Sequence, residues 1–267
     1  MSKFQLGIST ASLFTRLFTE DAIPMVRELG SEAAEVFMAT FREYTPSFGE
    51  LFASRQGTLP IHSIHNLNQH FEPDLFNPSP RTREDCEEWL RTFLNNGKLM
   101  GAKYYTFHGR PRLKPGAYPI DFEGMGKRLE EINAICREYG ITLCYENVNW
   151  TLYNYAGFFK SLEPYAPSIK ATLDIKQARL GGVDPYDFVE DMGPKLVTVH
   201  LSDHTEDGKM CPPGKGIFDF GKLFRCLRDR GFEGACLIEL YPSDFKEIAE
   251  LQESLDYLKS VRDSLYD

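Results

Sequence analysis

Short apolar runs alternate with longer amphipathic stretches along almost the whole chain. The apolar runs are rich in Val, Ile, Leu, Tyr and Phe, which is typical of strands buried on both faces. They predict eight strands, at residues 4–8, 33–37, 59–64, 103–107, 141–145, 170–174, 195–200 and 235–239. The amphipathic stretches predict helices near residues 20–29, 47–55, 81–100, 122–139, 156–163, 185–191, 219–230 and 245–262.

A glycine separates the amphipathic stretch from the next apolar run in four of these repeats. The four are Gly30, Gly101, Gly140 and Gly231. Helices often end next to a residue in the left-handed conformation, which glycine adopts without a Cβ clash. The pattern therefore predicts that each helix ends at its glycine and that a strand follows.

Strands that alternate with helices in this way indicate an α/β protein with a parallel sheet. The chain has 267 residues, and a (β/α)₈ barrel typically needs about 250. Because no linker or low-complexity stretch interrupts the repeat, we expect a single TIM-barrel domain over residues 1–267. A doubly wound sheet stays open as the alternative, because periodicity alone does not show whether a sheet closes.

The composition indicates an ordinary globular protein, with 42% apolar and 26% charged residues. No apolar run approaches the roughly 20 residues that span a bilayer. The first residues, MSKFQLGIST, lack the apolar core and cleavage site of a signal peptide, so we expect a cytoplasmic protein without a membrane partner. The six cysteines form no CxxC pair and are expected to stay reduced.

The formal net charge of −9 bears on possible partners. Nucleic-acid-binding proteins usually carry a basic stripe that neutralises phosphates, whereas the cations of this chain are scattered, which disfavours a nucleic-acid partner. The predicted helix 81–100 carries an apolar stripe of Trp89, Leu90, Phe93 and Leu94. This stripe either packs into the core or contacts a second subunit of a homo-oligomer.

Four apolar runs in the second half of the chain end on residues that bind divalent metals. ITLCYE ends on Glu146, KATLD on Asp174, KLVTVH on His200 and ACLIE on Glu239. Parallel strands joined by helices point the same way, so their last residues gather at one end of the sheet. Three carboxylates and an imidazole there suit one divalent ion, Mn²⁺, Mg²⁺, Co²⁺ or Zn²⁺. Taken singly, each carboxylate could instead be solvated or cap a helix.

Further histidines are predicted near the same end of the barrel. His62 follows the run TLPI, and His108 ends the run YYTF. Both are candidates for hydrogen bonding to a substrate or for binding additional metal ions, and each could also simply pack a loop. His65, His70 and His204 are predicted to lie in loops, at the surface or behind the site.

Glu35 is a charged residue within the otherwise apolar run AAEVF. A buried carboxylate costs free energy unless it is paired or hydrogen-bonded. We expect Glu35 to help build the floor of the pocket or to pair with a cation such as Arg42 or Arg110.

Together these motifs resemble the xylose isomerase-like barrel superfamily, which includes sugar phosphate isomerases and epimerases. The likeness extends over nearly the whole chain, from QLGIST on the first strand to IELY on the eighth. Its most specific parts are the four strand-end residues, the motif YENVNW and the segment PGKGIFDF. The resemblance implies a metal-dependent isomerase or epimerase of carbohydrate metabolism that binds a small sugar or sugar phosphate.

The resemblance also implies roles for the strand-end residues. Glu146, Asp174, His200 and Glu239 would bind one divalent ion, with manganese among the candidates. Glu146 and Glu239 would be the catalytic residues, one removing a proton next to the carbonyl and the other returning one to a metal-stabilised enediolate. Two bases on opposite faces suit an epimerisation, because a single base tends to return the proton to its original side.

The expected substrate-binding residues are His62, His108, Gln177, Lys209 and Trp150. Gln177 stands where many ketose epimerases carry a histidine that contacts substrate, and its amide can still form hydrogen bonds. Lys209 is the nearest cation to the arginine that many epimerases carry after the seventh strand. Trp150 could stack on the apolar face of a sugar or pack its own loop.

Three alternatives stay open at this point. The nuclease branch places a histidine at the position of Gln177 and an Asp-x-His pair in the loop that here reads KMCPPGKG, so an apurinic endonuclease is disfavoured. An inosose dehydratase-like lyase would use the same metal site and the same first proton abstraction. A non-catalytic carbohydrate- or metal-binding barrel is disfavoured, because binding alone does not require both Glu146 and Glu239.

Overall fold

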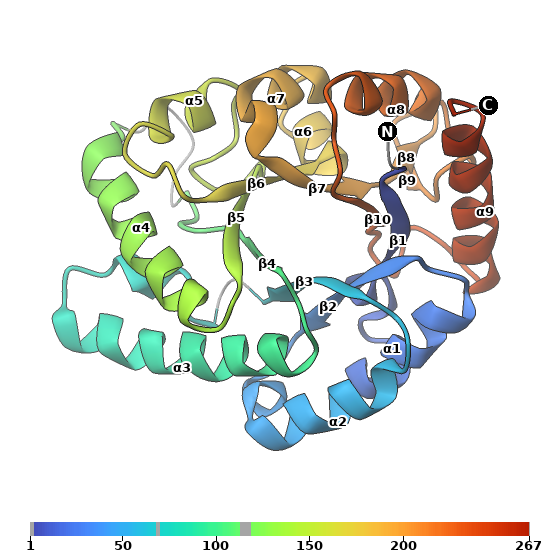
Figure 1. The fold of residues 1–267 in the computed structure, drawn as a ribbon. Coiled ribbons are helices and arrows are strands. Elements are labelled where there is room, and N and C mark those ends of the chain that lie inside the picture. The colour runs from blue at the N-terminus through green and yellow to red at the C-terminus, as the bar shows by residue number, and fades with distance from the viewer. Residues whose placement is uncertain (1–2, 68–69, 113–118, 267) are drawn as a thin grey trace.

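The computed structural model describes residues 3–67, 70–112 and 119–266, which form a closed barrel of parallel strands. Around the barrel the strand order is β1-β10-β7-β6-β5-β4-β3-β2, and the helices form a ring outside it (Figure 1). Because β1 pairs with both β10 and β2, the sheet closes on itself. The predicted (β/α)₈ TIM barrel is therefore confirmed, and the doubly wound alternative is wrong.

The bounds of the barrel strands differ by only a few residues from those predicted. The strands are β1 (Gln5–Ser9), β2 (Ala33–Met38), β3 (Ile61–Asn66), β4 (Tyr104–Phe107), β5 (Thr142–Glu146), β6 (Lys170–Asp174), β7 (Leu196–Leu201) and β10 (Ala235–Ile238). The α-helices are α1 (Thr19–Glu28), α2 (Pro46–Gln56), α3 (Pro80–Leu99), α4 (Phe122–Glu138), α5 (Phe158–Leu162), α6 (Ile175–Leu180), α7 (Pro185–Met192), α8 (Phe220–Asp229) and α9 (Ala249–Asp263). Short 3₁₀ turns lie at Thr10–Leu13, Phe41–Tyr44, Pro73–Phe76 and Gly193–Lys195.

Helix α6, the small sheet after β7 and the full length of β3 were not predicted from the sequence. Helix α6 begins directly after β6, and its six residues are too few to produce a helical periodicity in the sequence. The long loop after β7 folds into a small antiparallel sheet of β8 (Asp203–His204) and β9 (Met210–Cys211). Strand β3 continues to Asn66, two residues beyond its predicted end, and this changes which histidine reaches the end of the barrel.

The expected helix ends are confirmed by the backbone. The four glycines have positive φ angles: Gly30 at 87°, Gly101 at 73°, Gly140 at 76° and Gly231 at 69°. At the other end of a helix, Asp219 caps α8 by accepting a hydrogen bond from the backbone N–H of Lys222 at 2.8 Å. Local signals thus place the helices, while burial of the apolar faces stabilises them.

The alternation of side chains along β2 divides the barrel into an outer and an inner layer. Ala34, Val36 and Met38 belong to the main apolar cluster, which they share with residues of the surrounding helices. Glu35 and Phe37 alternate with them and point to the inside of the barrel, because successive strand residues face opposite sides. The apolar outer layer therefore stabilises the fold, and polar side chains such as Glu35 lie inside the barrel.

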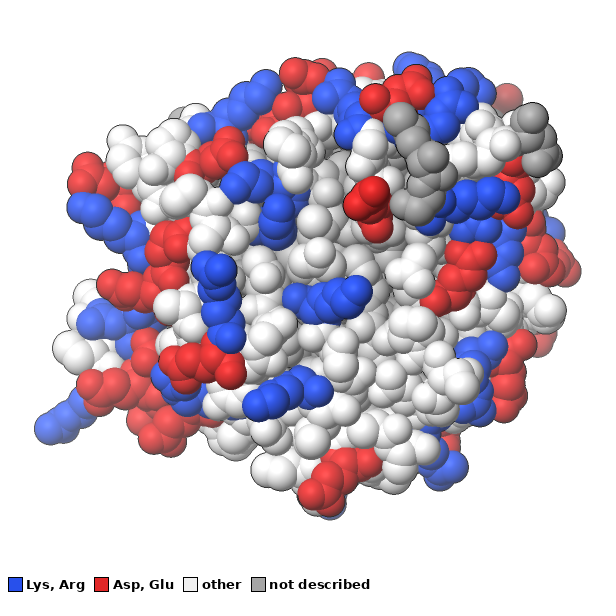
Figure 2. Space-filling view, in the orientation of Figure 1, with Lys and Arg blue, Asp and Glu red and all other residues white. Residues whose placement is uncertain are grey.

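Basic and acidic side chains are interspersed on the face of the molecule drawn in Figure 2. Blue and red side chains mix around its rim, and uncharged residues fill most of its centre. A basic stripe of the kind that binds nucleic acid is not visible on this face. None of the helices in the described part of the chain is both long enough and apolar enough to cross a membrane.

Candidate metal centre

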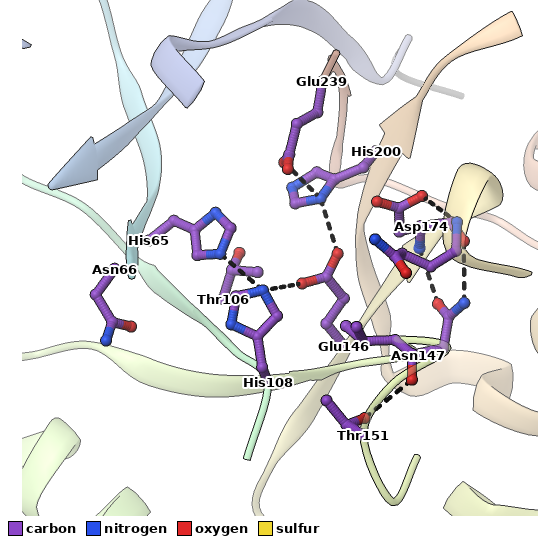
Figure 3. Close-up of polar contacts among 12 residues, drawn as sticks. His65, Asn66, Thr106, His108, Glu146, Asn147, Thr151, Asp174, His200 and Glu239 are labelled. Carbon is purple, nitrogen blue, oxygen red and sulfur yellow. Dashed lines mark hydrogen bonds and ion pairs between the residues drawn. The ribbon is translucent and has the colours of Figure 1, made fainter. Parts of the chain in front are cut away.

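Side chains from four barrel strands meet at the end of the barrel where these strands finish. Glu146 and Asp174 are the last residues of β5 and β6, His200 is next to last in β7, and Glu239 directly follows β10. His200 Nδ1 lies 3.1 Å from Glu146 Oε1 and 2.8 Å from Glu239 Oε2 (Figure 3). Ligand atoms of Glu146, Asp174 and His200 all lie within 4.8 Å of one another. The four predicted residues therefore form one buried cluster.

Asn147 holds the ends of β5 and β6 together through its side-chain amide. Its Nδ2 donates to the Asp174 carbonyl at 2.9 Å, and its Oδ1 accepts from the Asp174 N–H at 2.8 Å. One carboxylate oxygen of Asp174 accepts from the Gln177 N–H at 2.9 Å and caps α6. The backbone on either side of the cluster is therefore positioned by contacts within the protein, which reduces the reorganisation needed to bind a ligand.

Behind His200 lies Glu35, which is completely buried. Glu35 Oε1 is 3.2 Å from His200 Nε2. The same carboxylate accepts hydrogen bonds from three hydroxyl groups, of Ser9 at 3.0 Å, Ser63 at 2.8 Å and Thr106 at 2.6 Å. A carboxylate in this position fixes the ring orientation of a metal-ligating histidine. It directs His200 Nδ1 towards the carboxylates of Glu146 and Glu239.

The charges of the cluster control its protonation. Burial by itself lowers the pKa of His200, but Glu239, Glu35 and Glu146 raise it well above the ordinary value. Burial likewise opposes ionisation of Glu239, yet His200 lowers the pKa of this carboxyl to about 2. Burial raises the pKa of Asp174 to about 6, although the positive charge of Lys176 acts to lower it. An imidazolium thus faces ionised carboxylates, and a divalent cation bound at His200 Nδ1 would take the place of its proton.

The donor set of this cluster fits a divalent ion. Glu146 Oε2 and Glu239 Oε2 are buried, and the polar atoms that face them are His108 Nε2 at 3.2 Å and His200 Nδ1 at 2.8 Å. Buried carboxylates cost free energy unless a positive charge faces them, and a divalent cation at the centre of the cluster would supply that charge. Carboxylate oxygen and imidazole nitrogen are ligands that Mn²⁺, Co²⁺ and Zn²⁺ accept, so the group of Glu146, Asp174 and His200 fits such an ion, and Glu239 lies beside it against His200.

A cavity of about 270 Å³ opens onto the cluster. Glu146, Asp174 and Glu239 form part of its lining. Its aromatic and apolar lining residues are Ala11, Phe14, Phe37, Leu67, Trp150, Leu240, Tyr241 and Pro242. Four larger cavities, two of about 560 Å³ and two of about 370 and 340 Å³, lie elsewhere, but the described residues that line them do not bring carboxylates and imidazoles together in this way. The smaller cavity is therefore the candidate site.

Replacing Glu35 by glutamine is expected to lower the affinity for a divalent ion by roughly 10–100-fold, the range seen when partners of metal ligands are changed. The amide oxygen can still accept from the Ser63 and Thr106 hydroxyls, but the NH₂ group cannot accept from Ser9, and the side chain lacks the negative charge that faces His200. Calorimetric titration of the metal-free protein with Mn²⁺ measures the effect. Asp191→Asn is a matched control, because Asp191 is also buried but accepts from the Phe159 and Lys160 N–H groups outside the cluster. Equal Mn²⁺ affinity in wild type and Glu35→Gln would contradict the orienting role.

The sequence of the chain identifies its protein family. Residues 23–261 match the sequence profile of the xylose isomerase-like TIM barrel family. The chain belongs to this family. The resemblance inferred from the motifs is therefore confirmed for the family and its fold. No curated protein matches the chain in sequence.

Several solved structures share the fold of this xylose isomerase-like barrel. A D-tagatose 3-epimerase-like protein has a TM-score of 0.76 and 19% identity, with 98% of each chain covered. A D-psicose 3-epimerase determined in the presence of D-fructose has a TM-score of 0.75 and 16% identity, covering 97% of this chain and 99% of the other. The IOLI protein with a binding zinc atom has a TM-score of 0.78 and 16% identity, with 99% of each chain covered. At such identities the likeness shows the fold alone.

Three of the predicted substrate-binding residues line the cavity of this barrel, namely His108, Gln177 and Trp150. His108 Nε2 lies 3.2 Å from Glu146 Oε2, and the rings of His108 and Trp150 are 5.7 Å apart between centroids. Gln177 Oε1 accepts from the Asn149 N–H at 3.2 Å, which fixes the amide at the edge of the cavity. Their contacts with substrate remain predictions.

His62 does not reach the cavity, which corrects its expected position. It lies near the start of β3, where its Nε2 is 2.9 Å from Thr198 Oγ1, and it lines a separate cavity together with Gln5 and Lys103 at the beginnings of their strands. At His62 the register between β2 and β3 shifts, so that β3 contains one extra residue. The bulge points His62 to the inside of the barrel at the end opposite the cluster.

Two expectations about charged residues are also corrected. Lys209 is exposed in the turn between β8 and β9 and is not among the described residues that line the cavity. Its backbone carbonyl accepts from the N–H and the hydroxyl of Thr205, so the residue is used to shape the hairpin. Glu35 forms ion pairs with His65 and His200 rather than with Arg42 or Arg110, and its position behind His200 agrees with the other role expected for it, at the floor of the pocket.

The sequence reasoning missed His65, which was expected in a loop. It lies in β3, is 3% exposed and places its Nε2 3.0 Å from His108 Nε2. The signal was present in IHSIHN, because alternation over the longer strand puts Ser63 and His65 on the same side as Glu35 of β2. The predicted strand ended at residue 64, so the alternation was not followed as far as His65.

Proposed function

We propose that this protein is a divalent-metal-dependent epimerase or isomerase of a sugar. The observation that carries the proposal is the placement of two carboxylates, Glu146 and Glu239, at one cavity. They come from β5 and from the end of β10, strands that β6 and β7 separate in the barrel. A substrate in the cavity would therefore have a carboxylate on each of two sides, as inversion at a carbon requires.

The chemistry follows from these positions. When bound, a divalent cation supplies Lewis-acid stabilisation of negative charge on the oxygens of the substrate. One ionised glutamate takes the proton from the carbon next to the carbonyl, and the other, which enters the reaction protonated, delivers its proton to the enediolate from its own side. Proton exchange with water then restores both carboxyl groups. Glu239 lines the cavity and contacts His200, so it is placed to serve as one of the two groups. The buried setting keeps water from competing with these transfers.

The cavity favours a free monosaccharide over a sugar phosphate. At about 270 Å³ it lies below the roughly 300–1,000 Å³ typical of drug-sized ligands. Phosphate groups are usually bound by arginine, lysine or helix N-termini, and the described residues that line this cavity include neither lysine nor arginine. The similar fold of a D-psicose 3-epimerase that was determined with D-fructose supports a ketose as the first candidate.

Hydrogen exchange in deuterated water tests the proposed reaction. The protein is loaded with Mn²⁺ or Co²⁺ and incubated with a panel of ketoses and inososes, and magnetic resonance follows deuterium at the carbon next to the carbonyl. We expect exchange together with an epimeric or isomeric product for at least one ketose, and no exchange after chelation of the metal. An unsaturated product from an inosose would instead identify a lyase. Absence of exchange across the panel would contradict the proposal and favour a non-catalytic barrel.

Trp150 offers a test of sugar binding. If the indole stacks on the apolar face of the sugar, Trp150→Ala should raise KM about 2- to 12-fold with little change in kcat, since aromatic contacts are worth about 0.5–1.5 kcal/mol. Steady-state kinetics on the substrate identified above measures both constants. Tyr155→Ala is the control, because Tyr155 lies in the same loop with similar exposure but does not line the cavity. An unchanged KM in Trp150→Ala would show that the indole only packs the loop.

A further inference from the structure

A cavity of about 560 Å³, here called the α6–α7 cavity, lies between α6, the beginning of α7 and the segment that contains β8 and β9. Helices α6 and α7 lie next to each other on the outside of the barrel (Figure 1). The volume is within the roughly 300–1,000 Å³ typical of sites for small molecules. We propose that the α6–α7 cavity binds a small organic anion, in which a phosphate or carboxylate is joined to an apolar or aromatic group.

Most of the lining is apolar. The apolar and aromatic side chains that form it include Ile175, Val183, Tyr186, Met210 and Phe218. Phe218 packs edge-to-face against Phe220, with the ring centroids 4.9 Å apart, so its ring is held in place. Lys222 Nζ lies 4.2 Å from the centroid of the Tyr186 ring, which adds a positive charge near this wall. An apolar cavity with a few polar groups is the usual form of a site for a small molecule.

Arg179 supplies a positive charge at the lining itself. It lies in α6 and is half-buried, and its guanidinium forms no hydrogen bond or ion pair with any other residue that the structure describes. The guanidinium packs against the turn between β8 and β9, where a Cβ on Gly208 would lie only 2.9 Å from Arg179 Nη2. Glycine at this position therefore leaves room for it. An unpaired guanidinium in a cavity suits a phosphate or carboxylate, which it can bind through two parallel hydrogen bonds.

Two more polar side chains of this lining lack partners. Within the described part of the chain, the imidazole of His204 forms no hydrogen bond, and the buried hydroxyl of Ser202 has none either. Burial and the positive charge of Arg179 lower the pKa of His204, although Asp203 acts to raise it. Arg179 and His204 are thus close enough to repel each other when both are charged. An anion bound beside them would remove this repulsion and accept their hydrogen bonds.

The acidic side chain at this cavity does not favour a cation. Asp184 is the single carboxylate among the described lining residues. Its Oδ1 accepts from the Tyr186 N–H at 2.9 Å and caps α7, so it is already used within the protein. A metal ion would meet one carboxylate here and would be repelled by Arg179. The charges therefore favour an anion.

The α6–α7 cavity is separate from the candidate sugar site. Among the residues that the structure describes, none lines both cavities. They are nevertheless built on the same segments, because Arg179 follows Gln177 by two residues in α6, and Ser202 follows His200 by two residues after β7. The proposed anion site goes beyond the sugar reaction and stands or fails independently of it.

Phenyl phosphate, which joins an anionic group to an aromatic ring, is the first probe. The full chain is labelled with carbon-13 at its methionine methyl groups, stripped of metal with a chelator and titrated, with benzoate as the carboxylate probe and phenol as the neutral one. Met210 lines the cavity, so its methyl resonance, assigned with Met210→Leu, reports binding there. We expect this resonance to shift with phenyl phosphate or benzoate and to stay unchanged with phenol at the same concentrations.

Arg179→Met should weaken the binding of phenyl phosphate by roughly 10–100-fold, because it removes charge-assisted hydrogen bonds. Arg137→Met is the matched control, since Arg137 is exposed on α4 and does not line this cavity, and it should bind as the wild type does. Thermal unfolding checks that Arg179→Met is folded, and Arg179→Gln replaces it if it is not.

Three results would overturn the proposal. The first is a Met210 resonance in the wild type that does not move with either anion. The second is a shift with phenol as large as that with phenyl phosphate, which would show an apolar cavity without preference for anions. The third is equal affinity for phenyl phosphate in Arg179→Met and the wild type. The first two are measured on the unaltered protein, so they do not depend on the folding of a variant.

Discussion

Replacing Glu239 by glutamine is expected to reduce turnover of the sugar substrate by roughly 10²–10⁴-fold, the contribution of a positioned acid or base. The amide has almost the same shape as the carboxylate but neither accepts nor delivers a proton. Glu146→Gln should have an effect at least as large, since Glu146 faces both His200 and His108. The rate of deuterium exchange into the substrate, measured at saturating metal, gives the size of the loss for each variant.

The interpretation depends on the metal content of the same samples. A Glu239→Gln protein that keeps its metal and binds the sugar but does not exchange deuterium would establish Glu239 as a proton-transferring group. Glu50→Gln is the control, because the Glu50 side chain is exposed on α2, forms no hydrogen bond or ion pair with the other residues that the structure describes, and the variant should have wild-type activity. Exchange by Glu239→Gln within tenfold of the wild-type rate would show that another group moves the proton.

Replacing Asp174 by asparagine is expected to abolish high-affinity metal binding while the protein stays folded. The loss of affinity should exceed the roughly 10–100-fold cost of changing an outer partner, because a charged ligand is removed. Asparagine still carries an oxygen that can accept from the Gln177 N–H, so the cap of α6 is kept. Calorimetry with Mn²⁺ and thermal unfolding of the metal-free protein measure the two effects separately.

Asp174→Ala provides the comparison that separates the two roles of this residue. It removes both the ligand and the cap, so it should lose metal binding and also about 0.5–2 kcal/mol of stability. Asp219→Ala removes the equivalent cap from α8, away from the cluster, and should cost stability alone. Unchanged Mn²⁺ affinity in Asp174→Asn would mean that Asp174 is only a helix cap, the alternative already visible in the sequence.

The fold and the main cluster could be predicted from the sequence because both depend on local patterns. Short, nearly continuous apolar runs, separated by amphipathic stretches and glycines, indicate alternating strands and helices. In a parallel barrel the ends of the strands meet, so the positions of Glu146, Asp174, His200 and Glu239 follow from the runs that they terminate. The structure brings these four residues together, although their role as metal ligands remains a prediction.

Which histidine joins this cluster depended on the length and the register of β3. The alternation in IHSIHN indicates His65 only if the strand runs on to Asn66. A single extra residue in β3 and a strand that runs on to Asn66 place His62 at one end of the barrel and His65 at the other. A shift of one residue in register reverses the side to which a strand residue points, and nothing in the residues around His62 announces it. The predicted site contained His62, whereas the structure places His65 there.

The partners of buried charges were decided in the same way. Glu35 is far in sequence from His65 and His200, and the three meet only because β2, β3 and β7 point these side chains into the barrel. Local propensity specifies where strands and helices form, whereas closure of the sheet specifies which distant side chains share the interior. For this protein, the sequence alone therefore determined where the strands and helices form. Which distant side chains pair was decided only by the closed barrel, because electrostatic pairing depends on distance in space rather than in sequence.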